Sequence, residues 1–229
     1  MSATSIPAST FQFLNELKKN NERPWFNDHK ERYVAANEQF KAFAQAVVDQ
    51  MSHYDQIETH KVFRIYRDVR FSKNKAPYKT SFSGSLKRAT KWLRGGYYFH
   101  VEPGSTIVAG GFFAPNSEDL KRIRTEIAAD DQPLRRITAD PAFVSTFGEL
   151  YGDGVKTAPK GFSKDHPAID LIRLKQFLVK RSFTDEQAMT PTFLDEVVHT
   201  FRHMRPFFDY MSEVLTTDAN GTPLWPKDS

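Results

Sequence analysis

The spacing of hydrophobic residues changes twice along the chain, and this pattern constrains the fold more than any other feature. Up to about residue 52, apolar residues recur every three or four positions, as on one face of a helix. Between about residues 63 and 113 they recur every second position, as in half-buried strands. After Pro115 the helical spacing returns. This order predicts an α+β fold in which an antiparallel meander sheet is flanked by N-terminal and C-terminal helices.

The first block predicts two helices, at residues 10–19 and 28–52. Ser9 and Gln12 have the spacing of a capping box, which marks the start of the first helix. Asn27 can cap the second helix. Asparagines and a proline between the two ranges are typical of a break.

The middle block predicts a run of short strands, at residues 63–71, 78–86, 97–102 and 106–113. In the first of these, apolar and polar residues alternate, but Arg67 falls on the apolar face. Either a bulge turns Arg67 outward or its side chain enters a lined pocket. In the last strand, the consecutive Gly110 and Gly111 indicate a bulge or a close approach of another part of the backbone.

The last block predicts mostly helices, at residues 118–129, from Asp140-Pro141, at 168–173 and from Thr190-Pro191 to about 215, with one strand at 174–179. Asn116 or Ser117 is placed to cap the first of these helices. Pro206 is expected to kink the final helix or to split it in two, because proline removes a hydrogen bond from the helix interior.

The length of 229 residues allows one large domain or two small ones. The chain has no internal repeat and no clear linker, so we expect a single α+β domain over residues 1–229. Its ordered core is expected at about 9–215. The segment 216–229 is rich in polar residues and contains glycine and prolines, so we expect a mobile tail there.

Several classes of protein are excluded by composition. The chain has no cysteine, which excludes a disulfide framework, thiol catalysis, cysteine-ligated zinc and iron–sulfur clusters. No apolar run approaches the length of a membrane-spanning helix. The N-terminus lacks the basic and apolar regions of a signal peptide. We therefore expect a cytoplasmic protein that is not attached to a membrane, and no cofactor is indicated.

Positive charge is concentrated in one part of the chain. Residues 61–94, called here the basic segment, contain eleven lysines and arginines and a single acid, Asp68. This segment carries +10, although the whole chain carries only +4, so the other 195 residues carry −6. Such asymmetry indicates an anionic partner, although a charge run can also be a solvated face.

Part of the basic segment resembles a known family. Residues 67–79 read RDVRFSKNKAPYK, which is similar to the R-D-[VT]-R-F-[SA]-K-[DN]-K-x-P-Y-K stretch of the family called domain of unknown function 2461. Further similarity lies in GYYFHVEP at residues 96–103, in Gly110-Gly111-Phe112, and in APKGF followed by DHP at residues 158–167. The resemblance covers about residues 11–215. It implies a single α+β domain and assigns no activity. Asn74 stands where the family most often has an acid.

The basic segment supplies the candidate ligand-binding residues, which are Arg64, Arg67, Arg70, Lys73, Lys75, Tyr78 and Lys79, with Lys160 from a later loop. Arginine offers paired donors to phosphate or carboxylate, and lysine offers a movable charge. We therefore expect a small anionic ligand. In the alternative interpretation, Asp68 pairs with Arg67 or Arg70, and the remaining cations solvate the edge of a sheet. Lys160, beside Gly161, lies either in an anion-binding loop or in a simple turn.

Aromatic residues are interspersed with these cations, as on some surfaces that hold single-stranded nucleic acid. The same residues are common in ordinary strands, and no RNP-like or GxxG motif is present. Nucleic acid is therefore an alternative partner, as is an acidic protein. The sequence does not indicate an oligomeric state.

Catalytic motifs are sparse. The chain has no GxSxG, HExxH or P-loop motif. If the protein is an enzyme acting on an anionic substrate, the candidates for proton transfer are Asp68, Tyr98, His100 and Glu102, of which His100 and Glu102 share a strand face. His199 and His203 are four apart on a predicted helix, a spacing that suits a metal, but the sequence indicates no third ligand.

Overall fold

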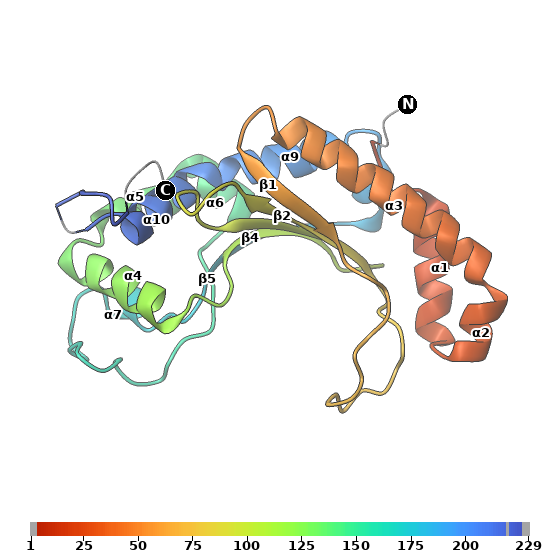
Figure 1. The fold of residues 1–229 in the computed structure, drawn as a ribbon, viewed down its shortest axis with the longest axis horizontal. Helices are drawn as coiled ribbons and strands as arrows, with labels where there is room; N and C mark the ends of the chain where they lie inside the picture. Colours follow the sequence, from red (N-terminus) through yellow and green to blue (C-terminus); the bar gives the residue numbers. More distant parts are fainter. Residues whose placement is uncertain (1–3, 219, 226–229) are drawn as a thin grey trace. The chain divides into compact units, whose positions relative to one another are not determined.

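The fold is α+β, as the order of the blocks predicts. The computed structural model describes residues 4–218 and 220–225. Five strands form one antiparallel meander in the order β1-β2-β3-β4-β5 (Figure 1). They are β1 (Ile57–Val62), β2 (Phe82–Arg88), β3 (Gly96–Val101), β4 (Thr106–Phe112) and β5 (Phe177–Phe183).

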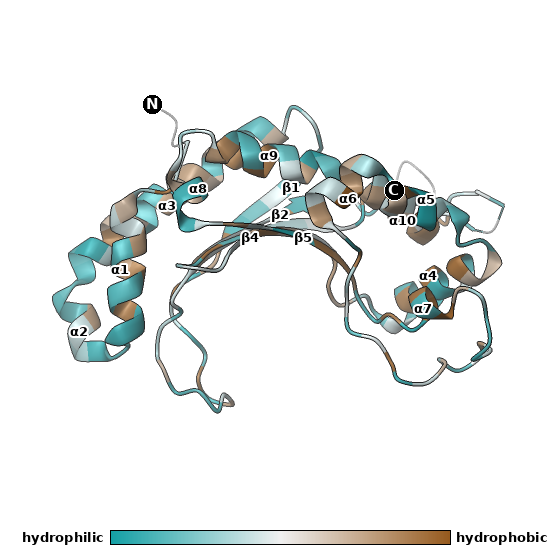
Figure 2. Ribbon diagram, turned by 180° about the vertical axis from the view of Figure 1, so that it is seen from behind, coloured by the Kyte–Doolittle hydropathy of each residue, from teal (hydrophilic) through white to brown (hydrophobic). Residues whose placement is uncertain are grey.

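Helices precede, separate and follow the strands. They are α1 (Ala8–Lys19), α2 (Arg23–Asp28), α3 (Lys30–Met51), α4 (Ser117–Ala129), α5 (Gln132–Ala139), α6 (Pro141–Phe147), α7 (Ile169–Ile172), α8 (Asp185–Met189), α9 (Phe193–His203) and α10 (Arg205–Thr216). Many of them carry hydrophobic residues on one side and hydrophilic residues on the other (Figure 2). Within the described part of the chain, no helix combines the length and the apolar character that a membrane crossing needs.

The chain divides into two compact units. The first contains Met1–Leu86, Tyr98–Val108 and Ser182–His199, and the second contains Lys87–Tyr97, Ala109–Arg181 and Thr200–Ser229. A single domain over the whole chain therefore stays a prediction. The predicted mobile tail includes residues 219 and 226–229, which lie outside the described residues.

The core of the first unit lies between α3 and one face of the sheet, and α1 and α2 pack on α3 (Figure 1). Phe40 and Phe43 of α3 are fully buried, with ring centroids 5.4 and 6.1 Å from that of Phe99 in β3. Side chains alternate along a strand, so the neighbours of Phe99 point away from α3. Tyr98 and His100 therefore lie on the opposite face, called here the open face.

In the second unit, α10 packs against α4 and α5. The close approach predicted at the paired glycines is present. A Cβ atom on Gly110 would lie 2.5 Å from the sulfur of Met204. Gly111 has φ +130°, and a Cβ there would lie 2.2 Å from the carbonyl oxygen of Phe177. Only glycine fits both contacts.

The predicted strand at residues 63–71 is wrong. The edge strand β1 lies earlier, and residues 63–81 form a long loop with one isolated bridge, between Tyr66 and Tyr78. Phe71, expected on a half-buried face, is 96% exposed. The expected strand at 78–86 begins only at Phe82, because Pro77 has no N–H and the segment that follows it is held by other contacts.

Other boundaries also differ from expectation. The first helix begins at Ala8, after Pro7, so Ser9 and Gln12 do not cap it. The long helix predicted at 28–52 is α3, but His29 rather than Asn27 stands at its N-cap. The predicted break before it contains a short helix, α2, and Asn27 lies inside that helix. The late strand is β5, at residues 177–183 rather than 174–179. Pro206 does split the final helix, and Asn116 does cap α4 through its side chain.

Candidate anion-binding site

The loop between β1 and β2 carries most of the predicted ligand-binding residues and extends past the ends of both strands (Figure 1). Its two arms pair at the base. The N–H of Arg67 donates to the carbonyl of Pro77 at 2.9 Å, and the N–H of Lys79 donates to the carbonyl of Ile65 at 2.7 Å. These bonds fix the backbone on either side of the cationic side chains.

A side-chain clamp fastens the same base to the helices. The amide of Asn21 donates to the carbonyl of Tyr78 and accepts from its N–H, both at 3.1 Å. The ring of Tyr78 stacks on Phe26 with centroids 3.9 Å apart, and Tyr78 is only 4% exposed. Tyr78 is therefore part of the hydrophobic core, and its backbone and ring together hold the loop in place.

Four cations gather beside this base, and we call them the cation cluster: Lys61, Arg64, Arg67 and Lys79. The ammonium groups of Lys61 and Lys79 lie 5.3 and 5.6 Å from the ring centroid of Phe63. Burial lowers the pKa of Lys79, and the charges of Arg64, Lys61 and Arg67 lower it further. Among the residues that the structure describes, no carboxylate lies within ion-pair distance of the four.

Other cations of the loop already have partners. Arg70 forms a two-pronged ion pair with Asp68, at 3.0 and 2.6 Å, as the alternative interpretation of the sequence predicts. This pair lowers the pKa of Asp68. Lys75 donates to the carbonyl of Val69 at 3.0 Å. Lys73 is exposed. The cationic candidates of this loop thus divide into three members of the cation cluster (Arg64, Arg67 and Lys79), a paired group (Arg70 and Lys75) and Lys73.

The open face carries a chain of hydrogen bonds. Tyr98 Oη lies 3.3 Å from His100 Nδ1, and His100 Nε2 lies 3.2 Å from Glu102 Oε2. The hydroxyl of Thr80 donates to the other oxygen of Glu102 at 2.7 Å. Burial alone would raise the pKa of Glu102, but the hydrogen bonds from Thr80 and His100 outweigh it and lower the pKa. The shared face of His100 and Glu102 is confirmed.

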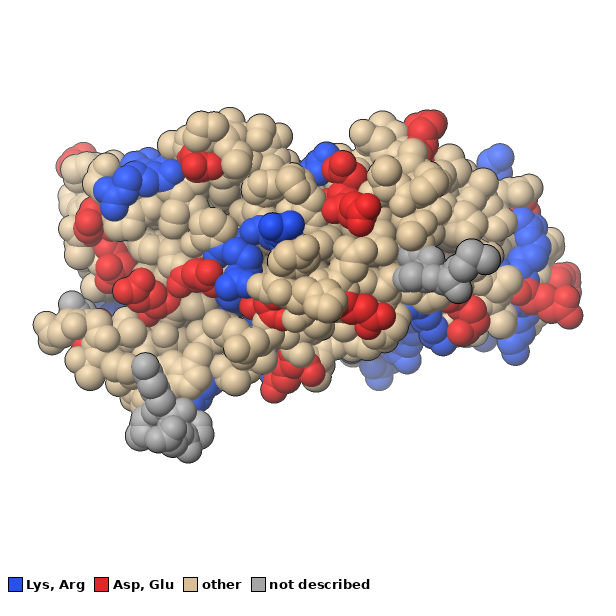
Figure 3. Space-filling view, turned by 90° about the horizontal axis from the view of Figure 1, so that it is seen from above, with Lys and Arg blue, Asp and Glu red and all other residues tan. Residues whose placement is uncertain are grey.

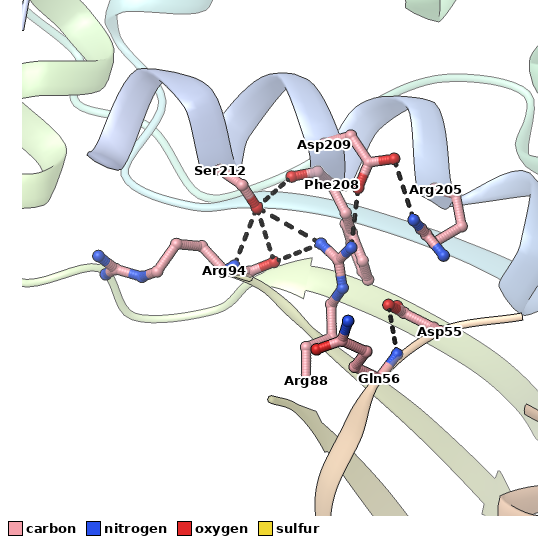
Figure 4. A network of polar contacts seen from close by, with 8 residues as sticks. All are labelled: Asp55, Gln56, Arg88, Arg94, Arg205, Phe208, Asp209 and Ser212. Carbon is pink, nitrogen blue, oxygen red and sulfur yellow. Dashed lines mark hydrogen bonds and ion pairs between the residues drawn. The ribbon is translucent and has the colours of Figure 1, made fainter. Parts of the chain in front are cut away.

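Two arginines at the end of the basic segment, Arg88 and Arg94, form polar contacts within the second unit (Figure 4). Arg88 is fully buried, and its guanidinium donates to Asp209 at 2.8 Å, to the carbonyl of Arg94 at 3.0 Å and to Ser212 Oγ at 3.4 Å. The side chain of Arg94 pairs with Asp119. These two arginines stabilise the fold, so the +10 of the segment overstates the charge that a ligand can meet.

The remaining candidates lie elsewhere in the chain. Lys160 belongs to the second unit, in a turn closed by the N–H of Phe162 and the carbonyl of Pro159 at 3.1 Å. His199 and His203 are on α9. Among residues 4–218 and 220–225, no group of three or more histidines and acids is arranged to hold a metal ion.

A cavity of about 620 Å³ lies in the second unit, but its lining does not suit an anion. Glu118, Glu126, Glu213 and Asp218 outnumber the cations that line it. On the surface that Figure 3 shows, acidic and basic side chains are interspersed. The cation cluster differs from both, because its four charges have one sign.

Three residues of this site were not predicted from the sequence. Lys61 lies inside the basic segment, but the misplaced strand left it out of the candidate set. Phe63 was assigned to a core face and instead lies beneath two lysines. Asn21 has no sequence signal, because its partner Tyr78 is 57 residues away.

Comparison with known proteins supports the resemblance. No curated protein and no solved structure matches the chain. A family model described as a conserved hypothetical protein, DUF2461, matches residues 9–210. The match spans both the loop that carries the cation cluster and the strand that carries Tyr98, His100 and Glu102. The chain therefore belongs to the DUF2461 family.

Proposed function

We propose that the protein binds an anionic ligand, bearing phosphate or carboxylate groups, at the cation cluster. The observation that supports this most directly is the environment of Lys79. Its charge is disfavoured by burial and by three neighbouring cations, and among the described residues no acid compensates it. Folded chains seldom hold like charges together without a counter-charge, unless a ligand supplies it.

The geometry of the cluster suits a compact anion. The charges of Arg64, Lys61 and Arg67 repel that of Lys79 strongly enough to help lower its pKa. A bound anion turns this repulsion into attraction. Arg64 and Arg67 can each give two parallel hydrogen bonds to one oxyanion group, and Lys61 and Lys79 can adjust to its position.

The surroundings of Phe63 add an apolar surface to the site. Its ring lies beneath Lys61 and Lys79 and is 6.3 Å from the ring of Tyr98, centroid to centroid. A ligand that joins a phosphate or carboxylate to a flat or apolar body can place its charge on the lysines and its body on these rings.

Calorimetric titration with pyrophosphate tests the proposal. We expect binding that weakens as salt is added, because exposed charges are screened. Lys79→Gln should reduce the affinity at least tenfold, about 1.4 kcal/mol. Lys30→Gln, which removes one exposed charge from the start of α3, is the matched control and should leave the affinity unchanged. Absence of pyrophosphate binding, or equal affinity in the Lys79 and Lys30 variants, would contradict the proposal.

Nucleic acid is a second candidate ligand because Phe71, in the same loop, is 96% exposed and lies beside Arg70. Fluorescence anisotropy with labelled single-stranded DNA and RNA separates the two. If the ligand is a small anion, strands bind only at low salt and pyrophosphate displaces them. Nucleic acid is favoured instead if strands bind at physiological salt and Phe71→Ala weakens that binding. Each lost phosphate contact should then lower the slope of log affinity against log salt concentration by about 0.7.

A further inference from the structure

The hydrogen-bonded side chains of the open face have a fixed order. Tyr98, His100 and Glu102 are at alternate positions in and just after β3, so all three side chains point to one side. Thr80 approaches from the neighbouring segment and holds the second oxygen of Glu102. Each group in the series therefore has its position set by the next.

The hydrogen bonds also fix where the protons lie. Glu102 is a carboxylate at neutral pH and can only accept. In the neutral form of the imidazole, His100 Nε2 must therefore carry the proton and donate it to Glu102. This leaves Nδ1 of His100 as an acceptor, and the only proton available to it in this contact is the phenolic proton of Tyr98.

A hydroxyl, a histidine that accepts its proton and a carboxylate that orients the histidine form the arrangement that activates nucleophiles and general acids in many enzymes. Here the hydroxyl is a phenol. His100 and Glu102 are 20% and 26% exposed, so the series is partly shielded from water but open to a ligand.

The series lies next to the cation cluster. Phe63 contacts both, since its ring neighbours the ring of Tyr98 and lies beneath Lys61 and Lys79. The backbone joins them a second time, because Thr80, which holds Glu102, directly follows Lys79. The two ammonium groups and the ring of Tyr98 therefore border the same aromatic ring, so a ligand held by the lysines lies beside the series.

We propose that Tyr98, His100 and Glu102 form a proton-transfer site that acts on the anionic ligand held by the cation cluster. The identity of that substrate class rests on the proposed function, whereas the activation of Tyr98 does not. The phenolic oxygen of Tyr98, once its own proton has passed to His100, takes a proton from the substrate. His100 takes the proton of Tyr98 at Nδ1, and Glu102 positions His100.

Acylation by p-nitrophenyl acetate reports this activation. The phenolic oxygen of Tyr98 forms a bond to the acetyl carbon, the bond from that carbon to p-nitrophenolate breaks, and the phenolic proton passes to His100 Nδ1. We expect Tyr98 to be acylated at least tenfold faster than Tyr54 and Tyr66, which are 46% and 45% exposed. Peptide mass spectrometry identifies the acylated residue, and Tyr98→Phe should remove the fast phase.

Variants of the positioning residues test the order of the series. His100→Gln and, as a second variant, His100→Asn should slow acylation of Tyr98 to the rate of Tyr66, with the circular dichroism spectrum unchanged. Glu102→Gln should slow it as well and shift His100 away from its Nε2-protonated form, as measured by long-range ¹H–¹⁵N NMR. If Tyr98 reacts no faster than Tyr66, or if folded variants of His100 leave its rate unchanged, the hydrogen bonds are only structural and the inference fails.

A charged ester separates this inference from the proposed function. 4-Nitrophenyl hydrogen succinate carries a carboxylate, so the cation cluster should make it acylate Tyr98 at least tenfold faster than the neutral acetate does, and pyrophosphate should remove the difference. Fast reaction with both esters at equal rates would overturn the anion-binding proposal alone. Binding of pyrophosphate without fast acylation by either ester would overturn the proton-transfer site alone.

Discussion

Arg88→Met is expected to lower the free energy of unfolding by about 3 kcal/mol while leaving the affinity for pyrophosphate unchanged. Methionine fills part of the buried volume but donates no hydrogen bond. The acceptors that lose a donor include the carboxylate of Asp209, the carbonyl of Arg94 and the hydroxyl of Ser212. An unsatisfied buried acceptor costs about 1–3 kcal/mol, and the loss at Asp209 is the smaller one because that side chain is 49% exposed.

Loss of the guanidinium also weakens the second unit through its neighbours. Ser212 accepts from the N–H of Arg94 at 2.9 Å and donates to the carbonyl of Phe208 at 2.7 Å, so it links the chain after β2 to α10. Arg88 lies 5.5 Å from the ring centroid of Phe208, and this cation–π contact is lost as well. We therefore expect Arg88→Met to lower the free energy of unfolding by more than the loss of one ion pair would.

Urea unfolding measures this effect, with Lys121→Met as the matched control. Lys121 is exposed on α4 in the same unit, so its replacement should change the stability by no more than about 0.5 kcal/mol. A loss of less than 1 kcal/mol in Arg88→Met would show that Arg88 does not hold the fold. A loss of pyrophosphate affinity in the folded variant would show that the basic segment works as one surface.

The roles of the arginines could not be read from the sequence, because the basic segment looks uniform there. Arg88 and Arg64 look alike in the sequence, and the carboxylate that pairs with Arg88, that of Asp209, is 121 residues away in α10. By contrast, the pair of Asp68 and Arg70 could be anticipated, because its members are two residues apart. Local partners are visible in a sequence, and distant ones are not.

The difference between local and distant partners also explains which helices and strands could be predicted. Alternation in β3 places His100 and Glu102 on one face whatever else the chain does, and Pro206 ends a helix through its own ring. A segment with alternating apolar and polar residues becomes a strand only where a neighbouring segment can form hydrogen bonds along it. Residues 63–71 alternate, but the segment opposite is held by Asn21 and interrupted by Pro77, so only one bridge forms.

The true edge strand was invisible for a related reason. β1 reads IETHKV, and its four central residues are exposed. An edge strand with charged residues is protected from pairing with other chains, but it has no apolar alternation to detect. Because β1 was missed, Lys61 was not recognised as a neighbour of Lys79, although both contact the ring of Phe63.

A double variant of the cation cluster is expected to lose pyrophosphate binding and keep its stability. Arg88→Met, by contrast, is expected to lose stability and keep pyrophosphate binding. In the wild-type protein, pyrophosphate at a hundredfold excess over its dissociation constant should add about 2.7 kcal/mol to the free energy of unfolding. In Arg67→Gln/Lys79→Gln this increase should fall below about 1 kcal/mol. Without ligand, the double variant should be at least as stable as the wild type, because the charge of Lys79 opposes folding.

The pH dependence follows from the lowered pKa of Lys79. The pKa of Lys79 is lower in the folded protein than in the unfolded chain. At a pH where Lys79 is protonated in both states, its charge therefore lowers the stability of the protein. Stability is regained as the pH rises through the folded-state pKa, because Lys79 then loses its proton in the folded protein. The ligand-free wild type should therefore gain stability relative to the double variant on going from neutral pH toward the usual lysine pKa, near 10.4. Pyrophosphate affinity should fall over the same range, because Lys79 loses its charge.

If the double variant is less stable than the wild type at neutral pH, or if pyrophosphate still stabilises it fully, the cation cluster holds the loop rather than a ligand.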